Sequence, residues 1–158
     1  MLLGDVTGYE LGKFIHVLAA VVGLGVTFAY AVFMGFADRF APHASPAVLR
    51  ASQVSDRYIV TPGLILILIT GIYMVSEVDF DNASWISVGF IAVFVLLGMV
   101  HAFFGPRVRK AIELAEADVA DGGDLGPEYR KLAKQLATGG QIAGLITALT
   151  IFFMVVKP

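Results

Sequence analysis

The sequence predicts an all-α fold, in which one transmembrane domain over residues 1–158 forms a four-helix bundle. The chain is 58% hydrophobic and only 15% charged. Its apolar residues gather in four runs, each close to the roughly 20 residues that a helix needs to cross about 30 Å of hydrocarbon. These runs cover residues 14–37, 59–75, 85–104 and 137–156. The charged residues lie in the gaps between them, a pattern typical of an integral membrane protein.

The first helix is expected over residues 11–37. It is too long for a cleavable signal sequence, acidic residues precede it, and no small-residue cleavage site follows it. Small residues recur along it at every fourth position, namely Ala19, Gly23, Thr27, Ala31 and Gly35. The fourth helix repeats this pattern with Gly140, Gly144 and Ala148. Such stripes let helix backbones approach closely in lipid, so we interpret them as contacts within the bundle, with a dimerisation face as the alternative.

The other helices are expected over residues 46–78, 84–119 and 128–156. Ser45-Pro46 resembles an N-cap followed by a first-turn proline, and Pro62 should kink the second helix near the cytoplasmic surface. Gly105-Pro106 marks a bend or a boundary in the third helix, before a charged amphipathic stretch. A glycine-rich loop at residues 121–127 then leads into the fourth helix.

The basic residues predict the orientation of the bundle. Nine of the eleven lysines and arginines fall between helices 1 and 2 or between helices 3 and 4: Arg39, Arg50, Arg57, Arg107, Arg109, Lys110, Arg130, Lys131 and Lys134. The positive-inside rule places both of these segments in the cytoplasm, so that both termini face outward. The link between helices 2 and 3 agrees with this orientation, because it carries Glu77, Asp79 and Asp81 and no basic residue.

Several kinds of site are excluded or weakly indicated. The chain has no cysteine, which excludes disulfides and thiolate metal sites. It has no nucleotide-binding glycine motif, nucleophile elbow or zinc signature, and no nucleic-acid partner is expected. Glu113, Glu116 and Asp118 lie beside basic residues and are typical of a solvated helix face. No catalytic residue can therefore be assigned.

Two histidines, His16 and His101, lie inside apolar runs. An ionisable residue within a membrane span is by default a hypothesis for a functional site. His16 is near the outer end of the first helix, whereas His101 is near the cytoplasmic end of the third. At about 1.5 Å per residue they should be roughly 20 Å apart along the bilayer normal. They cannot both ligate one iron, so a bis-histidine haem is disfavoured.

His16 shares a helix face with Ala20 and Gly23, which leaves room for a flat prosthetic group. A methionine can supply the second axial ligand of a haem, and Met74 and Met154 are expected at the depth of His16. The alternative is structural: His16 hydrogen-bonds Tyr73 or a backbone carbonyl, or reaches the outer interface, and another helix fills the space.

His101 should lie at the depth of Gln141 and near Tyr58 and Thr61. A hydrogen bond to Gln141 would satisfy it. The alternative is a porphyrin or metal site near the cytoplasmic face, where Arg57 and Arg107 could pair with propionates or other anionic groups.

Five segments carry a resemblance to known proteins: residues 13–16 (KFIH), residues 56–62 (DRYIVTP), residues 71–73 (GIY), His101 with residues 105–107 (GPR), and residues 154–158 (MVVKP). With them the chain resembles, over nearly its whole length, a bacterial family of predicted integral membrane proteins with no assigned function. The resemblance implies a multi-pass protein of the bacterial inner membrane, with the lipid bilayer as its surroundings.

The chain is more distantly similar to the HemJ-type membrane protoporphyrinogen oxidase. That family also has a histidine early in helix 1, a Thr-Pro in helix 2 and a histidine late in helix 3. Its members bind b-type haem and oxidise protoporphyrinogen, so the similarity implies a porphyrin-related role for His16 and His101. This chain departs from the family after His16, where residues 22–26 (VGLGV) replace a tryptophan and aromatic-rich stretch.

The preferred interpretation is a membrane bundle that houses haem b or a related porphyrin for electron transfer or porphyrin oxidation. His16 is then the ligand, and His101 is a second site or a polar clamp. The main rival is a non-catalytic accessory subunit that packs its small-residue stripes against other membrane-protein subunits. A transporter or channel ranks third, because such proteins normally carry more charge within the membrane.

Overall fold

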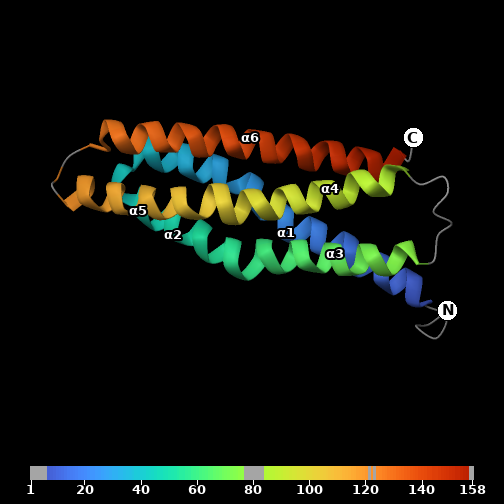
Figure 1. Ribbon diagram of the computed structural model, residues 1–158. Helices are drawn as coiled ribbons and strands as arrows, with labels where there is room; N and C mark the ends of the chain where they lie inside the picture. Colours follow the sequence, from blue (N-terminus) through green and yellow to red (C-terminus); the bar gives the residue numbers. More distant parts are fainter. Residues whose placement is uncertain (1–6, 77–83, 121, 123, 157–158) are drawn as a thin grey trace.

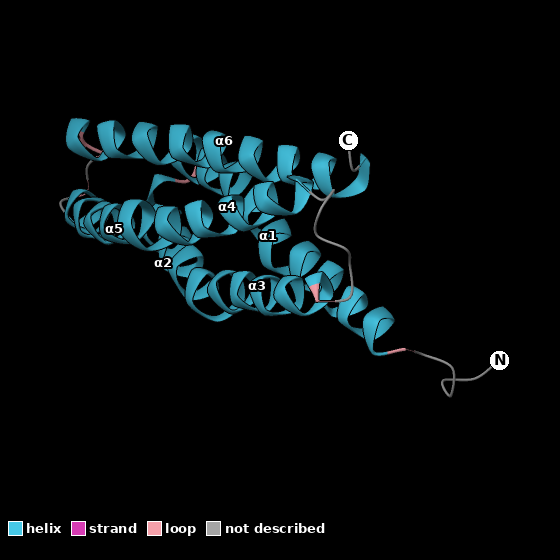
Figure 2. Ribbon diagram, turned by 45° about the vertical axis from the view of Figure 1, so that its right-hand side comes forward, coloured by secondary structure: helices cyan, strands magenta, loops and turns pink. Residues whose placement is uncertain are grey.

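The computed structural model describes residues 7–76, 84–120, 122 and 124–156. Within these residues all regular structure is helical (Figure 2). Four continuous helical segments are long and apolar enough to cross a membrane: Gly8–Phe40, Pro42–Val75, Trp85–Ala120 and Pro127–Val156. The first of them crosses the bundle obliquely, and its N-terminal end lies at the same end of the bundle as the C-terminal end of the last (Figure 1). The predicted all-α fold with four membrane-spanning helices is therefore confirmed.

Helix α1 (Gly8–Phe40) is longer at both ends than expected. Its start is fixed by a capping box. The Thr7 hydroxyl accepts a hydrogen bond from the Glu10 backbone N–H, and the Glu10 carboxylate accepts one from the Thr7 backbone N–H. This reciprocal pair satisfies two of the amide groups that a helix start leaves without partners.

The second segment contains a short 3₁₀ turn η2 (Pro42–Ala44), α2 (Ser45–Ser55), a π-helical turn η3 (Asp56–Val60) and α3 (Thr61–Val75). Pro62 has no backbone N–H, and its ring crowds the preceding turn. The chain adapts by widening that turn, so that the Thr61 N–H donates to the Asp56 carbonyl five residues back. The distortion expected at Pro62 is thus a π-helical turn.

The third segment follows the same pattern. Helix α4 (Ser84–Gly98) passes through a π-helical turn η5 (Met99–Phe104) into α5 (Gly105–Ala120), just before Pro106. There the Gly105 N–H donates to the Val100 carbonyl. The Gly105-Pro106 pair therefore marks the boundary between the π-helical turn and α5, within one continuous helical segment. The last helix, α6 (Pro127–Val156), is continuous, as expected.

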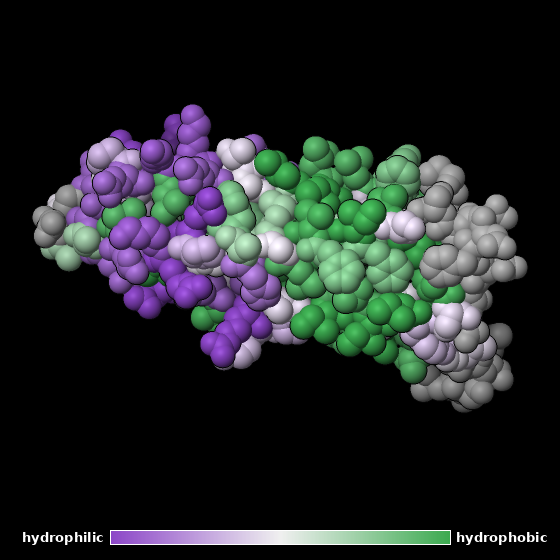
Figure 3. Space-filling model, viewed as in Figure 1, coloured by the Kyte–Doolittle hydropathy of each residue, from purple (hydrophilic) through white to green (hydrophobic). Residues whose placement is uncertain are grey.

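The bundle has two halves of opposite surface character (Figure 3). We call the part formed by α3, α4 and the second half of α6 the apolar half, and the part formed by α2, α5 and the first half of α6 the polar half. Helix α1 runs through both. Each half has a core of its own. In the apolar half the buried residues are Ala19, Val60, Leu64, Ile67, Val93 and Leu96. In the polar half they are Leu49, Val108, Ala111, Ile112, Ala115, Leu125 and Tyr129.

Helices α1 and α3 touch backbone to backbone at two glycines. A Cβ atom added to Gly63 would lie 2.9 Å from the Gly23 Cα, and one added to Gly23 would lie 3.1 Å from the Gly63 Cα. Ala19 is also buried, but Gly35, at the end of the same stripe, has no neighbour within 4 Å of an added Cβ. The stripe on the first helix therefore serves packing within the bundle only over its first part.

A carboxylate joins three helices in the polar half. Asp38 Oδ1 on α1 accepts hydrogen bonds from the hydroxyls of Ser45 on α2, at 2.6 Å, and Tyr129 on α6, at 2.7 Å. Both donors are almost fully buried. Ser45 is thus not the N-cap of α2, a position that Ala44 takes, because its hydroxyl is directed to Asp38. Hydrogen bonds to a charged acceptor are stronger than neutral ones.

Replacing Gly63 with alanine should lower stability by about 1–3 kcal/mol, the usual cost of overpacking. The added methyl would meet the backbone of Gly23, which cannot rotate away. Thermal unfolding of the protein in detergent measures the change. Gly35→Ala is the control, because its methyl would meet open space. Equal midpoints for the two variants would contradict the backbone contact.

Tyr129→Phe should cost about 1.5–3 kcal/mol, the range for a hydrogen bond to a charged group. The change removes one of the two hydroxyls that Asp38 accepts from and leaves the ring in place. Tyr58→Phe is the same chemical change at an exposed side chain and should leave stability unaltered. The argument fails if denaturant unfolding shows no difference between the two.

Candidate functional site

The apolar half contains a cavity of about 510 Å³ that is partly open at its surface. This volume lies within the range of about 300–1,000 Å³ that is usual for small-molecule and cofactor sites. All four long helical segments contribute to its walls, and nearly all lining side chains are apolar. The residues used below are His16, Ala20, Gly71, Met74, Gly89 and Met154.

His16 lies in the wall of this cavity, and a threonine fixes its ring. His16 Nδ1 lies 2.9 Å from Thr70 Oγ1 on α3. The Thr70 hydroxyl has one proton, which it donates to the Leu66 carbonyl at 2.6 Å. With that proton engaged, a neutral His16 would donate from Nδ1 to Thr70 Oγ1, and this tautomer would leave the lone pair on Nε2. A histidine held in this way is the usual arrangement of a metal ligand, because its second nitrogen is oriented by a hydrogen bond.

Small residues create the space beside the ring. The imidazole lies against Gly71, where an added Cβ would be 3.5 Å from His16 Cε1. On the opposite wall the Met154 methyl group packs directly on Gly89, leaving no room for a side chain there. Ala20 lies one turn after His16 and also lines the cavity. The room expected on the His16 face is present, and no helix fills it.

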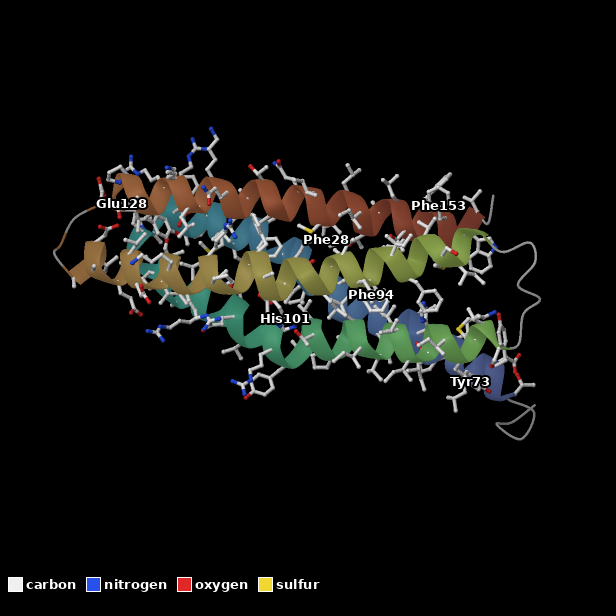
Figure 4. All side chains as sticks on the ribbon, in the orientation of Figure 1. Phe28, Tyr73, Phe94, His101, Glu128 and Phe153 are labelled. Carbon is white, nitrogen blue, oxygen red and sulfur yellow. The ribbon has the colours of Figure 1, made fainter. Side chains whose placement is uncertain are left out.

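The structure brings three of the predicted site residues together. Met74 on α3 and Met154 on α6 line the same cavity as His16. Tyr73, the hydrogen-bond partner considered for His16, instead packs its ring against Gly8 and Gly12 at the end of α3 (Figure 4). Thr70 takes that role, and sequence reasoning did not find it.

His101 lies outside the cavity. It is exposed in the π-helical turn η5, and its Nε2 lies 3.4 Å from Thr61 Oγ1 (Figure 4). The partner expected for it, Gln141, is exposed and is not its hydrogen-bond partner in the structure. Thr61 and Thr70, the partners of the two histidines, are nine residues apart on α3, or roughly 13 Å. The two histidines therefore occupy separate sites, as expected from their depths.

Arg57 and Arg107 do not line the cavity. Arg57 is exposed, with its guanidinium 5.7 Å from the centroid of the Tyr58 ring. Arg107 lies 4.0 Å from the centroid of the Phe103 ring and donates to the Phe103 carbonyl and to Gln135. Among the described residues no hydrogen bond joins either arginine to His101. The structure thus does not assemble the anion-pairing group considered for His101.

The two threonines of α6 in the wall of the cavity bond within their own helix. The hydroxyls of Thr147 and Thr150 on α6 donate to carbonyls one turn back in the same helix, those of Ala143 and Ile146. Within the described residues no group of three or more His, Cys, Asp or Glu side chains could hold a metal ion. His16 is therefore the side chain through which the cavity could bind a metal-containing group.

Comparison with known proteins places the chain in a family. Residues 10–158 match the family described as Predicted integral membrane protein (DUF2269). The match covers almost the whole chain, and the protein belongs to this family. No curated protein and no solved structure matches it. The comparisons thus support the first resemblance and add nothing to the similarity with HemJ-type oxidases.

The geometry at His16 predicts an uncommon tautomer. The ¹⁵N chemical shifts of labelled histidine should show His16 with Nδ1 protonated and Nε2 bare, and Thr70→Val should remove this preference. The chain has only three histidines, so His43→Gln and His101→Gln variants assign the signals. An Nε2-protonated His16 in the unaltered protein would rule out the described hydrogen bond.

Proposed function

We propose that this member of a family of predicted integral membrane proteins binds a b-type haem or a related porphyrin in the cavity of its apolar half, for electron transfer or porphyrin oxidation. The observation that carries the proposal is the pairing of His16 with Thr70 at 2.9 Å. It leaves a nitrogen lone pair in the wall of a cavity that is otherwise apolar. An acceptor nitrogen among apolar side chains is costly unless it binds a partner, and His16 is partly buried among such side chains.

The chain offers ligands for such a group. His16 would hold the iron through Nε2, and Thr70 would orient the ring and fix its tautomer. Met74 or Met154 would supply the second axial ligand, a combination known from cytochromes. Ala20, one turn after His16, would leave room for the flat ring, whereas Gly71 and Gly89 make room for the His16 imidazole and the Met154 methyl group themselves. The bound group supplies one-electron chemistry, and the protein sets its potential through ligand identity and burial.

Lys13 replaces the two arginines as the residue proposed to meet the propionates. Its Nζ lies 5.7 Å from the centroid of the Tyr9 ring, and Tyr9 lines the cavity. It is also one helical turn from His16 on the exposed side of α1. An ammonium group at the edge of an apolar cavity pairs with a carboxylate while the ring stays buried. Arg57 and Arg107 lie too far toward the polar half for this role.

The experiment is a titration of the purified apoprotein with haemin in detergent, followed by a reduced-minus-oxidised visible spectrum. The unaltered protein should show a b-type spectrum with saturable 1:1 binding. His16→Ala should abolish it, and Thr70→Val should weaken binding by about 10- to 100-fold, as for other residues that support a metal ligand. His101→Ala is the matched control, because it removes a histidine from an apolar run outside the cavity and should bind like the unaltered protein.

Each outcome separates the alternatives. Loss of the signal in His101→Ala with retention in His16→Ala would move the site to the turn at Thr61. Binding that is unchanged in both variants would mean nonspecific uptake of haemin. No spectrum with any variant would overturn the proposal and favour the rival function, an accessory subunit of a membrane complex.

The similarity to HemJ-type oxidases suggests the narrower role of porphyrin oxidation, but only as part of this proposal. It rests on His16, His101 and the pair Thr61-Pro62. In the structure Thr61 contacts His101, so two members of that pattern lie together. His16, the third, lies in the cavity. Electron transfer would involve only the cavity. Porphyrin oxidation of the HemJ type would also require a function for the contact between Thr61 and His101.

A further inference from the structure

The outward face of α1 stays apolar well beyond the apolar half. The contact between Gly23 and Gly63 places these residues of α1 and α3 at the same depth. From there toward the polar half, the exposed large apolar side chains of the second segment end at Val54, about 13 Å further on. Those of α1 continue to Phe40, about 25 Å beyond Gly23. A stretch of α1 roughly 12 Å long, which contains Phe33, Phe36 and Phe40, therefore exposes large apolar side chains at a depth where the second segment exposes none.

The bilayer does not account for this stretch. Arg57 and Arg107 lie at the edge of the apolar half, and placing a charged side chain within hydrocarbon costs free energy. Beyond that edge the outward faces of α5 and α6 carry charged residues, namely Arg109, Lys110, Glu113, Glu128, Lys131 and Lys134. A bilayer thick enough to cover Phe40 would also have to cover these charges.

The exposed area is large for a surface in water. Phe33, Phe36 and Phe40 are 57%, 61% and 66% exposed. At about 200 Å² for each ring, the three present roughly 370 Å², which is within the range of the largest apolar patch on a typical monomer and marks an interaction site. Two copies of this patch would bury roughly 740 Å² together. The exposed side chains of α1 in the membrane would bring the total toward the 1,200–2,000 Å² of a stable interface.

The spacing on this face fits a second copy of the same helix. Small or apolar residues occur at alternating intervals of four and three from the membrane into the polar half: Leu18, Val22, Gly25, Ala29, Val32 and Phe36. This is the repeat with which parallel helices pack along their length. Gly25, near its centre, also lines the cavity of the apolar half and has no neighbour within 4 Å of an added Cβ. No charged residue interrupts α1 between Lys13 and Asp38, so residues 18–36 of two copies would not repel each other. Beyond these residues, the Arg39 guanidinium lies 5.3 Å from the centroid of the Phe40 ring.

We propose that the protein is a homodimer in which α1 packs in parallel against α1 of a second copy, around a two-fold axis normal to the membrane. Residues 18–36 form the seam, and Phe33 and Phe40 flank it in the polar half. A two-fold interface requires one surface to complement itself, and this face supplies both an open glycine and large side chains. The proposal goes beyond the cofactor site and does not depend on it.

Cysteine cross-linking in native membranes tests the dimer, since the chain has no cysteine of its own. Val32→Cys and Phe36→Cys should each give a disulfide-linked dimer in high yield, because a disulfide forms only when the two Cα atoms come within about 7 Å. Val54→Cys is the matched control. Val54 is 56% exposed and Val32 is 69% exposed, and by their distances from Gly63 and Gly23 the two lie at the same depth on different helices. It should give little dimer.

A second variant does not depend on oxidation. Phe36→Lys adds a charge to an exposed position, so each copy should fold normally while the dimer dissociates. Mass measurement in nanodiscs should show two copies per disc for the unaltered protein and one for the variant. Equal cross-linking at residues 32, 36 and 54, or none at 32 and 36 together with single copies in nanodiscs, would overturn the proposal. Quenching of a probe at residue 36 by lipid-borne quenchers would then identify the bilayer as the covering surface.

Discussion

The backbone contact between Gly23 and Gly63 determines how the functional residues meet. Helices α1 and α3 run in opposite directions from this point, so residues at equal distances from it lie at equal depth. His16 is seven residues before Gly23, and Thr70 is seven residues after Gly63. Two helical turns separate each from the contact, and their side chains form the hydrogen bond of 2.9 Å. The same relation brings Gly12 against Tyr73 and Met74.

Pro62 and Pro106 likewise affect how the second and third helical segments face each other. Pro62 and Pro106 each cause a π-helical turn just before them, η3 and η5. A π-helical turn inserts one residue into the helical repeat and thereby rotates the faces that follow it. Thr61 lies at the end of one such turn and His101 within the other, and the two side chains meet. The separation of the two histidines thus follows from two local distortions and one close helix contact.

The sequence predicted the number, the order and the approximate limits of the helices, because hydropathy over 20 residues is a strong signal in a chain of this composition. It also predicted that His16 would share its depth with Met74 and Met154, since depth follows from counting residues along straight helices. The sequence did not indicate Thr70 as the partner of His16, and it paired His101 with Gln141. Counting residues gives the depth of a side chain along a helix, but not the rotation of the helix about its own axis. That rotation depends on which glycines of two helices are in contact and on π-helical turns, which amino-acid composition does not predict. The small-residue stripe predicted a contact at Gly23, but no pattern in the sequence indicated Gly63, next to Pro62, as its partner.

The cavity itself is a physical argument for a ligand. Helices in lipid associate through close packing, so a bundle that leaves about 510 Å³ between its helices forgoes the contacts that would hold it together. Lipid chains could fill the space, but they would offer no partner to the Nε2 lone pair of the His16 tautomer that donates from Nδ1 to Thr70. A flat apolar group with an electrophilic centre satisfies both the volume and the nitrogen, and a metal porphyrin is a group of this kind.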